Sequence, residues 1–372
     1  MMKLKTRFQS VNRASSYVLF GAYLAALLVS GVAIADEYPY IYRSPAFLGR
    51  GDTGISDAND ENALLYNPAG IAMGKGVHRK TGVSLGLQAN EVLASEAVKS
   101  LQGKQSEDST ELLVNSMGEP MNVGINAFIG TVFSRYGIGF YTNSTNTILL
   151  AKNPDFGAFE TASVAAVSQY GVVSGKAYKI APNQSLGLSI RFIRKQVVIG
   201  DIYGTDSGSV SDSQQTYSAS GTGYDIGYRF VGGSKNRINI GATLENIAGT
   251  SYESLDATPN EATIVDDPMT FNLAISYHMR LPVTRFKVLF DYRDVFSAVE
   301  SSLFKKLHLG SEVNLGEIVG VTAGFNQGYP TIGTYIDLKV VRFDLGMYSE
   351  EIGDVIGERA SRRIYLRGFV GF

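Results

Sequence analysis

The residues whose types could do chemistry in this chain are few, and their spacing does not favour catalysis. His78, His278 and His308 lie far apart and fit no metal-ligand spacing, so we expect each at a solvated or rim position. The chain has no Cys, which leaves no thiolate metal site and no disulfide framework. No Ser, His and Asp occur in an order with a nucleophile turn. The sequence therefore predicts no enzyme, no cofactor and no metal site.

An acidic cluster near the start of the chain is the other candidate. Asp52, Asp57, Asp60 and Glu61 could hold a cation, but their spacing lacks the pattern of a calcium loop. Asp57 and Asp60, with Asn59 between them, instead suit the start of a short helix, where side-chain oxygens accept hydrogen bonds from free backbone N–H groups. We therefore expect helix capping rather than cation binding.

The stretch that holds this cluster, 47–70, indicates a glycine hinge, a short helix and a break. Pro68 biases Asn67 out of the helical region and can itself begin a new helical turn. The simplest interpretation is an ordinary N-terminal arm, and the alternative is a plug for the barrel expected after residue 76. We assign residues 36–76 to this arm and plug. The expected plug and hinge residues are Gly49, Gly51, Asp57, Asp60, Tyr66, Asn67, Pro68, Ala69 and Gly70.

Residues 1–35 indicate export. Basic residues precede an apolar run over 17–35, which ends on the small residues Ala33 and Ala35. This is the pattern of a secretory signal peptide that is cleaved near Ala35. A single transmembrane anchor is the alternative, because the run is long enough to span a bilayer. No later stretch approaches the ~20 apolar residues of a membrane helix, so we expect a periplasmic protein, a secreted protein or a barrel.

Strands with a period of two fill most of the chain from residue 77 onwards. Val83, Leu85 and Leu87 lie on one face of the first strand, with Ser84 and Gln88 on the other. The stretch 91–117 breaks this alternation, and its apolar residues at helical spacing predict a helical insertion in a loop. The count of about 14 strands is even, as in bacterial single-chain barrels. Residues 77–372 therefore predict an all-β fold, a closed transmembrane antiparallel barrel.

The connections between these strands alternate in length. The long ones are 91–117, 146–157, 200–220, 248–267, 295–305 and 349–361, and the connection at 327–331 is short where a long one is expected. Outer-membrane barrels have short periplasmic turns and longer external loops. This parity predicts that the plug and the C-terminus lie on the periplasmic side of the outer membrane of a Gram-negative-type bacterium, and that the helical insertion lies outside.

Charged residues gather on the strand faces opposite the apolar rows. A charge facing lipid at mid-depth costs roughly 2–4 kcal/mol, so we place these residues inside the barrel. Both signs are present, which favours a network of salt bridges that fills the lumen and holds the plug; a polar channel wall is the alternative. The expected lumen residues are Arg191, Glu245, Lys287, Asp291, Arg293, Glu312, Asp337, Lys339, Asp344, Arg363 and Arg367.

The N-terminal stretch resembles the hatch region of the FadL/PorV superfamily of outer-membrane barrels. The resemblance is carried by 49–52, by 57–60 and by Tyr66-Asn67-Pro68-Ala69-Gly70, and 244–249 and 291–294 also look PorV-like. The superfamily contains long-chain fatty-acid transporters, PorV-type secretion-shuttle proteins and TraF-like proteins. The resemblance implies a barrel with an N-terminal hatch and no catalytic activity.

Several partners follow from these expectations. A strand that ends on Phe372 resembles the signal read by the barrel-assembly machinery, and the apolar face predicts contact with outer-membrane lipid. The net charge of −2 argues against a nucleic-acid partner. Three functions stay open: passive transport of hydrophobic, fatty-acid-like molecules, a PorV-like shuttle that binds exported or surface-attached proteins, and a structural outer-membrane protein.

Overall fold

The structure is a computed structural model, and all of its described residues belong to one compact unit, Glu37–Phe372. The described residues are 40–73, 81–101, 120–152, 160–204, 210–212, 215–234, 236–255, 264–299, 301–316, 318–352 and 357–371. The expected signal peptide, the part of the helical insertion beyond Leu101, His78 and Phe372 lie outside them.

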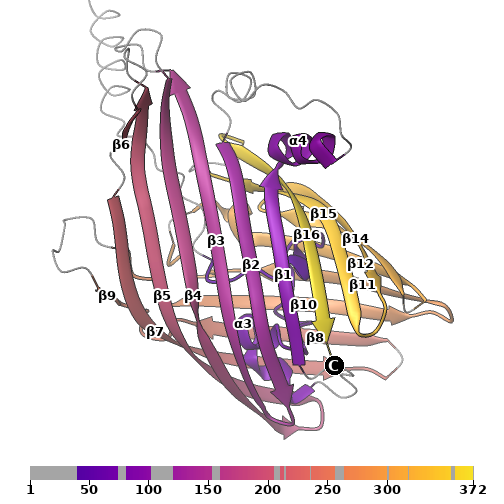
Figure 1. Ribbon diagram of the computed structural model, residues 1–372. Coiled ribbons are helices and arrows are strands. Elements are labelled where there is room, and N and C mark those ends of the chain that lie inside the picture. Colours follow the sequence, from indigo (N-terminus) through magenta and orange to yellow (C-terminus); the bar gives the residue numbers. More distant parts are fainter. Residues whose placement is uncertain are drawn as a thin grey trace, which may run out of the picture. The chain divides into compact units, whose positions relative to one another are not determined.

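Fourteen strands form a closed antiparallel barrel, as predicted (Figure 1). They are β1 (Thr81–Asn90), β2 (Pro120–Phe133), β3 (Tyr136–Lys152), β4 (Glu160–Ala181), β5 (Gln184–Gly204), β7 (Gln215–Gly232), β8 (Arg237–Glu245), β10 (Thr270–Arg280), β11 (Thr284–Tyr292), β12 (Leu307–Leu315), β13 (Val319–Asn326), β14 (Tyr329–Asp337), β15 (Val341–Glu351) and β16 (Ala360–Gly371). Each pairs with its neighbours in this order, and β1 pairs with β16. Closure leaves no unpaired edge, which a lipid environment requires. Two short strands, β6 (Val210–Asp212) and β9 (Tyr252–Ser254), pair with β5 and β7 inside long connections.

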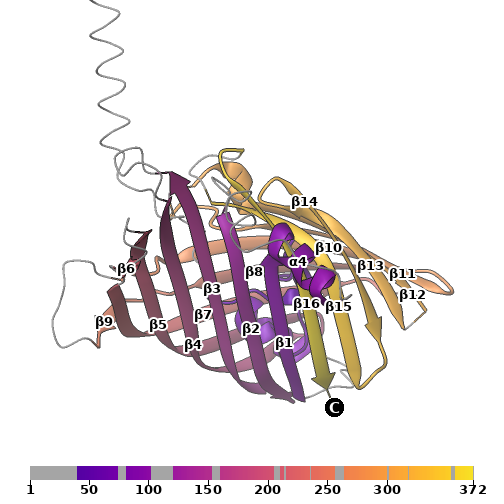
Figure 2. The same ribbon diagram turned by 45° about the horizontal axis from the view of Figure 1, so that its top comes forward.

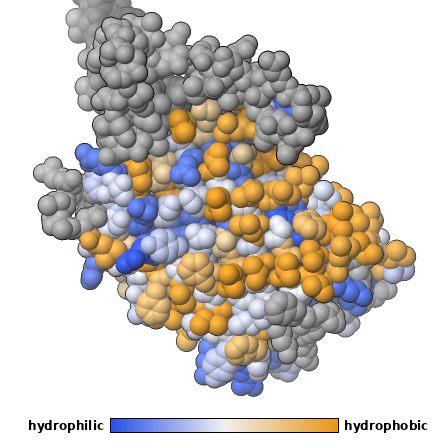
Figure 3. Space-filling model, in the orientation of Figure 1, coloured by the Kyte–Doolittle hydropathy of each residue, from blue (hydrophilic) through white to orange (hydrophobic). Residues whose placement is uncertain are grey.

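The outer surface is apolar because the strands alternate as the sequence predicts. On β1, Leu85 is 52% exposed whereas Ser84 is buried, and on β16 Leu366 faces out whereas Arg367 faces in. Figure 3 shows apolar residues gathered over β1, β2 and β14–β16. An apolar outer face around a charged interior is the arrangement of a membrane-spanning barrel. Among the described helices, none has the length and apolarity needed to cross a bilayer.

The connections alternate in length, so the barrel has two distinct ends. The turn end holds the tight turns 134–135, 182–183, 233–236, 281–283, 316–318 and 338–340, and the loop end holds the long connections. The predicted exception is the tight turn at 327–328 on the loop end. There Gln327 and Gly328 both have positive φ, 53° and 82°, as a two-residue type I′ hairpin requires.

One side of the barrel is much taller than the other. Strands β3, β4, β5 and β7 have 17, 22, 21 and 18 residues, whereas β11, β12 and β14 have 9 each. About 9–11 residues suffice to cross a bilayer. Because tight turns join the strands at the turn end, the extra length lies at the loop end, where these four strands form what we call the extended wall (Figure 2).

The N-terminal segment, residues 40–73, lies inside the barrel, where α3 is visible between the front and back strands (Figures 1 and 2). It contains α2 (Pro45–Leu48), α3 (Ala63–Tyr66) and the 3-10 helix η1 (Pro68–Met73). Asn67 is extended, with φ −163° and ψ 102°, and η1 begins at Pro68, as the sequence predicts. Outside the lumen, α4 (Glu91–Leu101) packs against β1 and β16, and η3 (Leu303–Lys306) lies in the β11–β12 connection.

Candidate functional site

Glycines on the inner face of the barrel make room for the N-terminal segment. A Cβ on Gly187 of β5 would lie 2.3 Å from the backbone of Pro68 and Ala69, and one on Gly227 of β7 would lie 2.1 Å from Oδ1 of Asn67. No real side chain tolerates such distances, so these two glycines form a seat for the Asn67-Pro68-Ala69 turn.

Polar contacts hold that turn in its seat. Asn67 donates from Nδ2 to the carbonyl oxygens of Ile55 at 2.9 Å and Tyr228 at 3.1 Å, and its Oδ1 accepts from the N–H of Ala69. Ser185 of β5 donates to the carbonyl oxygen of Ala69 at 2.8 Å. Asn67 thus joins two parts of the segment to the wall, which explains why an amide is placed directly before the proline.

The opposite side of the segment contacts β12 and β13 in the same way. A Cβ on Gly310 or on Gly324 would lie within 3 Å of the backbone at Arg50 and Gly51. Gly51 has φ +71°, and its own Cβ would meet the carbonyl oxygen of Leu309 at 2.1 Å. Two of the predicted hinge positions, Gly49 and Gly51, are therefore tightly enclosed by the barrel wall.

Asp52 is the centre of one ion cluster. It is fully buried, and its Oδ2 lies 3.0 Å from Nε of Arg43 and 3.0 Å from Nη1 of Arg293. Tyr66 donates its hydroxyl to Oδ1 at 2.6 Å. Burial alone would raise the pKa of Asp52, but the guanidinium groups of Arg293 and Arg43 outweigh it, and the pKa is lowered. The carboxylate stays charged, and its ion pair with Arg293, the residue that follows β11, joins the segment to the barrel wall.

Asp57 is the centre of a second cluster nearer the turn end. Its Oδ2 lies 2.9 Å from Arg50 and 3.1 Å from Lys287, and both cations also contact Glu312 of β12. Burial would raise the pKa of Asp57, but Lys287 and Arg50 hold it well below its usual value. The prediction that Asp57 caps a helix is wrong, because these cations bind its carboxylate. Asp60 and Glu61 bond next to α3: Oδ1 of Asp60 accepts from the N–H of Asn62, and Glu61 accepts from the side-chain amide of Asn62.

A third cluster lies on β15 and β16. Arg367 donates to Asp344 at 2.9 Å and to Ser84 of β1 at 2.7 Å, so it spans three adjacent strands. Arg363 pairs with Glu350, which also contacts Arg43 of the segment. These arginines face inward beneath an outer row of apolar residues, and their pairing offsets the loss of hydration.

The remaining predicted lumen residues divide into those that the structure brings into the lumen and one that it does not. Asp291 accepts from the N–H groups of Gly54 at 2.8 Å and Ile55 at 3.1 Å, and Arg191 binds Asp225 at 2.5 Å. Glu245 lines a cavity at the loop end, and Asp337 is half-buried at the end of β14. Lys339 is the exception: it lies exposed in the β14–β15 turn, because β14 ends before it, and it lines the turn-end mouth rather than the interior.

The position predicted for His308 is wrong, whereas His278 lines the turn-end mouth of the lumen. His308 is fully buried, and its Nδ1 lies 2.9 Å from the carbonyl oxygen of Gly51. His278 lies 3.3 Å from Asp57 with its side chain 11% exposed. Both are on inner strand faces that the N-terminal segment covers, and sequence spacing does not show that cover. Within the described ranges, no group of three or more acidic or histidine side chains is placed to hold a metal ion.

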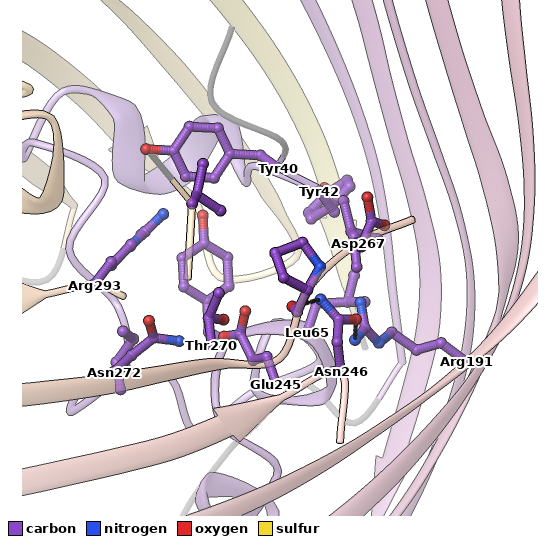
Figure 4. Close-up of a pocket in the computed structure, with 15 residues that line it drawn as sticks. Tyr40, Tyr42, Leu65, Arg191, Glu245, Asn246, Asp267, Thr270, Asn272 and Arg293 are labelled. Carbon is purple, nitrogen blue, oxygen red and sulfur yellow. Dashed lines mark hydrogen bonds between the residues drawn. The ribbon is translucent and has the colours of Figure 1, made fainter. Parts of the chain in front are cut away.

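A small cavity lies between the N-terminal segment and the loop-end strands. Figure 4 shows Tyr40, Tyr42 and Leu65 of the segment converging on it with Arg191 and Glu245 of the wall. Its volume of about 60 Å³ can hold a few water molecules. An engineered cavity of roughly 150 Å³ with apolar walls binds benzene. The cavity here is smaller and has charged walls, so in this conformation it has no room for an apolar ligand of that size.

The PorV-like stretch 244–249 helps to form this cavity. Asn246 accepts from Arg191 at 2.8 Å and donates to the carbonyl oxygen of Pro268 at 3.1 Å. Asp294, in the other PorV-like stretch, pairs with Lys306 at 3.0 Å and accepts from the N–H of Ala298. Both stretches therefore order loop-end connections.

The inner face of the extended wall becomes apolar above this cavity. Five inward residues, which we call the rim patch, share cross-strand partners: Ala165 and Val167 of β4, Val197 and Ile199 of β5, and Tyr217 of β7. Val167 is 36% exposed although it faces inward. The outer face at this height is mixed, with Arg194 and Gln196 exposed, Ser144 bonded to Ser168 at 2.8 Å, and Val198 and Ala166 also facing outward. The inner face of the wall is thus apolar here, whereas it is charged and polar along the membrane belt.

Several residues of this site are missing from the sequence-based assignment. Arg43, Arg50, Asp225 and Arg229 form central contacts, yet none is among the expected site residues. Asp225 and Arg229 are an even number of residues apart on β7, so they lie on the same face of the strand. Extending the predicted strand pattern to them would have placed both in the lumen. The inward glycines carry a similar signal, since Gly inside a strand marks close approach of another backbone.

Known channels share this architecture. The structure aligns with the CymD monoaromatic hydrocarbon channel over 90% of this chain and 99% of that chain, with 11% identity and a TM-score of 0.51. It aligns with the Ralstonia pickettii toluene transporter TbuX over 88% of this chain and 98% of that one, with 11% identity and a TM-score of 0.52. No protein-family model and no curated protein match the sequence.

At such low identity these likenesses show the fold. The chain has the 14-stranded barrel fold of these channels, which is the fold that the resemblance to the FadL/PorV superfamily implied. The neighbours are channels and a transporter, and the fold prediction is confirmed.

Proposed function

We propose that this protein is a non-enzymatic outer-membrane channel that admits small hydrophobic molecules by passive transport. The observation that carries the proposal is the rim patch, an apolar surface that faces into the mouth of the lumen above the level at which the inward residues are charged and polar. Water-exposed strands gain nothing from inward apolar residues unless an apolar partner covers them. The proteins of similar fold include a monoaromatic hydrocarbon channel and a toluene transporter, which supports a small hydrophobic substrate.

The structure would then represent the closed state of the channel. The N-terminal segment fills the lumen below the rim patch and is held by charged clusters around Asp52 and Asp57. Entry of an apolar molecule requires this plug to shift, and the Asn67-Pro68 break is the proposed hinge. A plug held by ion pairs can move without exposing a large apolar surface, because water can solvate the groups that separate.

Two further assignments rest on this proposal. We assign residues 1–35 to a signal peptide cleaved near Ala35, and we place the loop end outside the cell. The last strand would serve as the recognition element for the barrel-assembly machinery.

The test compares two neighbouring valines on opposite faces of β5. Val197 belongs to the rim patch, and Val198 faces outward at the same height. We expect Val197→Gln to reduce uptake of a radiolabelled fatty acid or toluene severalfold in a Gram-negative host without its own transporter, while Val198→Gln leaves uptake unchanged. Equal uptake by both variants and by wild-type protein at equal surface amounts would remove the rim patch from the pathway. Uptake no faster than in cells without the protein would remove the transport proposal.

A second candidate is the PorV-like shuttle that binds exported proteins. It is favoured by apolar side chains in the loop-end connections, where Val265 is 78% exposed and Phe296 is 77% exposed. A double variant, Val265→Ser with Phe296→Ser, distinguishes the candidates: loss of a bound exported protein with normal uptake would support the shuttle.

A further inference from the structure

The turn end of the lumen opens into a large cavity that is rich in positive charge. Its volume is about 1060 Å³, and both the wall and the N-terminal segment line it. Ten Lys and Arg but five Asp and Glu line it, although the chain as a whole carries a net charge of −2. Positive charge is therefore concentrated at this mouth.

The excess is sharpest on four adjacent strands. Arg237 of β8 lies directly opposite His278 of β10, which lies directly opposite Lys287 of β11. One step nearer the turn, Arg280 lies opposite Arg285. Neighbouring strands are about 4.8 Å apart, so these cations share an area roughly 10 Å wide. Like charges placed directly opposite each other, as Arg280 and Arg285 are, destabilise a sheet, and an anion would offset that cost.

Arg229 on β7 adds a buried cation beside this row. It is 3% exposed, and it donates to the backbone carbonyl oxygens of Ala58 at 2.6 Å and Asp57 at 3.3 Å. Its Nε is buried without a hydrogen-bond partner in the described part of the chain. Carbonyl oxygens bear no net charge, so they orient this guanidinium without neutralising it.

Two of the carboxylates that line the cavity are already engaged by other cations. Asp57 and Glu312 each contact both Arg50 and Lys287. Arg237 and Arg280 face into the cavity, and the residues described here form no ion pair with either side chain. These two arginines therefore present charge-assisted donors to the solvent that fills the mouth.

We propose that this mouth holds a binding site for a small soluble oxyanion, one that carries phosphate or carboxylate groups, formed by Arg229, Arg237, Arg280 and Lys287. Guanidinium groups match these oxyanions because their donors form a planar fork. The side chains face the lumen rather than lipid, so a soluble anion reaches them and a lipid headgroup does not. Arg237, Arg280 and Lys287 lie on three adjacent strands, two strand spacings apart at most, and Arg229 lies on the next strand, opposite Gly241. A patch of this size fits a compact anion better than an extended acidic peptide.

The experiment measures binding of inorganic pyrophosphate to the full-length purified protein in a neutral detergent by calorimetry, at low and at moderate NaCl. We expect saturable binding that weakens with salt and that Arg237→Gln with Arg280→Gln weakens about tenfold or more. The matched control, Arg194→Gln with Arg362→Gln, removes the same charge from exposed positions on the outer face and should bind like wild-type protein.

Three outcomes would overturn the proposal. One is the absence of saturable pyrophosphate binding to wild-type protein. Another is equal weakening in the control variant, which would show attraction to net charge alone. The third is saturable binding of a hexaglutamate peptide without binding of pyrophosphate, which would make this a peptide site. Heat-dependent gel mobility checks that each barrel is folded, and the single variant Arg280→Gln replaces the pair if the pair fails that check. Since binding needs no transport, the result is independent of the proposed channel function.

Discussion

The same strands build both ends of the lumen, yet the two ends differ in polarity. On β5, the inward residues near the turn end are Ser185, Ser189 and Arg191, whereas Val197 and Ile199 face inward near the loop end. The outward residues change from the apolar Leu188 and Phe192 to a mixed set, Arg194, Gln196 and Val198.

This switch shows where the membrane stops. Lipid dictates an apolar outer face only along the belt, and beyond it water reaches the outer face, so the inner face is free to become apolar. An apolar rim and a cationic turn-end mouth thus lie at opposite ends of the lumen, with the N-terminal segment between them. If the segment blocks passage between the two ends, variants that loosen it should open the lumen to ions.

The largest effect is expected from removing Asp52. In Asp52→Ala, Arg43 and Arg293 lose the carboxylate that they share and remain buried, which costs about 3–5 kcal/mol. We expect the segment to leave the lumen, so that single channels in planar bilayers conduct ions persistently. Asp60→Ala is the control, because the carboxylate of Asp60 accepts hydrogen bonds from the neighbouring Asn62 rather than from the barrel wall. Wild-type conductance in Asp52→Ala would show that this cluster does not hold the segment.

A larger side chain at Gly227 should also open the channel, by steric clash with the N-terminal segment. In Gly227→Ala the new Cβ would lie 2.1 Å from Oδ1 of Asn67, so the Asn67-Pro68-Ala69 turn must move. We expect faster trypsin cleavage within residues 40–73 and more frequent channel openings. In Gly368→Ala the nearest atom would be 4.0 Å away, so this variant should match wild-type protein. Identical cleavage rates in the two variants would argue against the seat.

Acid should release the segment reversibly. The pKa values of Asp52 and Asp57 are lowered from 3.8 when the segment is in place, so their contribution to stability is complete above that value. It is lost as the pH falls below 3.8 toward the lowered values. We expect conductance to rise in that range and to recover on neutralisation. The double variant Asp52→Asn with Asp57→Asn should lack the acid-induced step, and a step of unchanged size would assign it to other groups.

The smallest effect is expected at the edge of the seat. Ser185→Ala removes one hydrogen bond to the carbonyl oxygen of Ala69, a loss of about 1 kcal/mol. We expect slightly faster trypsin cleavage of the segment and no change in the steady conductance. Ser174→Ala, on the outer face of β4, is the matched control. A fully open channel in Ser185→Ala would mean that the seat, rather than the ion clusters, holds the segment.

Sequence by itself determined the barrel and its two ends. A strand repeats every two residues, so the faces of Leu366 and Arg367 follow from their order alone, and an apolar outer face in lipid forces closure. The number of strands and the parity of the connections, including the tight turn at Gln327, were also predictable, because turns and strands are local features.

Only the tertiary structure decided which charges meet. Arg50 and Glu312 are 262 residues apart and pair at 2.6 Å because the N-terminal segment crosses the lumen beside β12. The same crossing buries His308 and takes Asp57 away from helix capping. The apolar inner surface of the rim patch likewise depends on where the membrane belt ends on β5. Alternation gives each residue a face, but partners across a lumen depend on the path of a segment that has no repeating pattern.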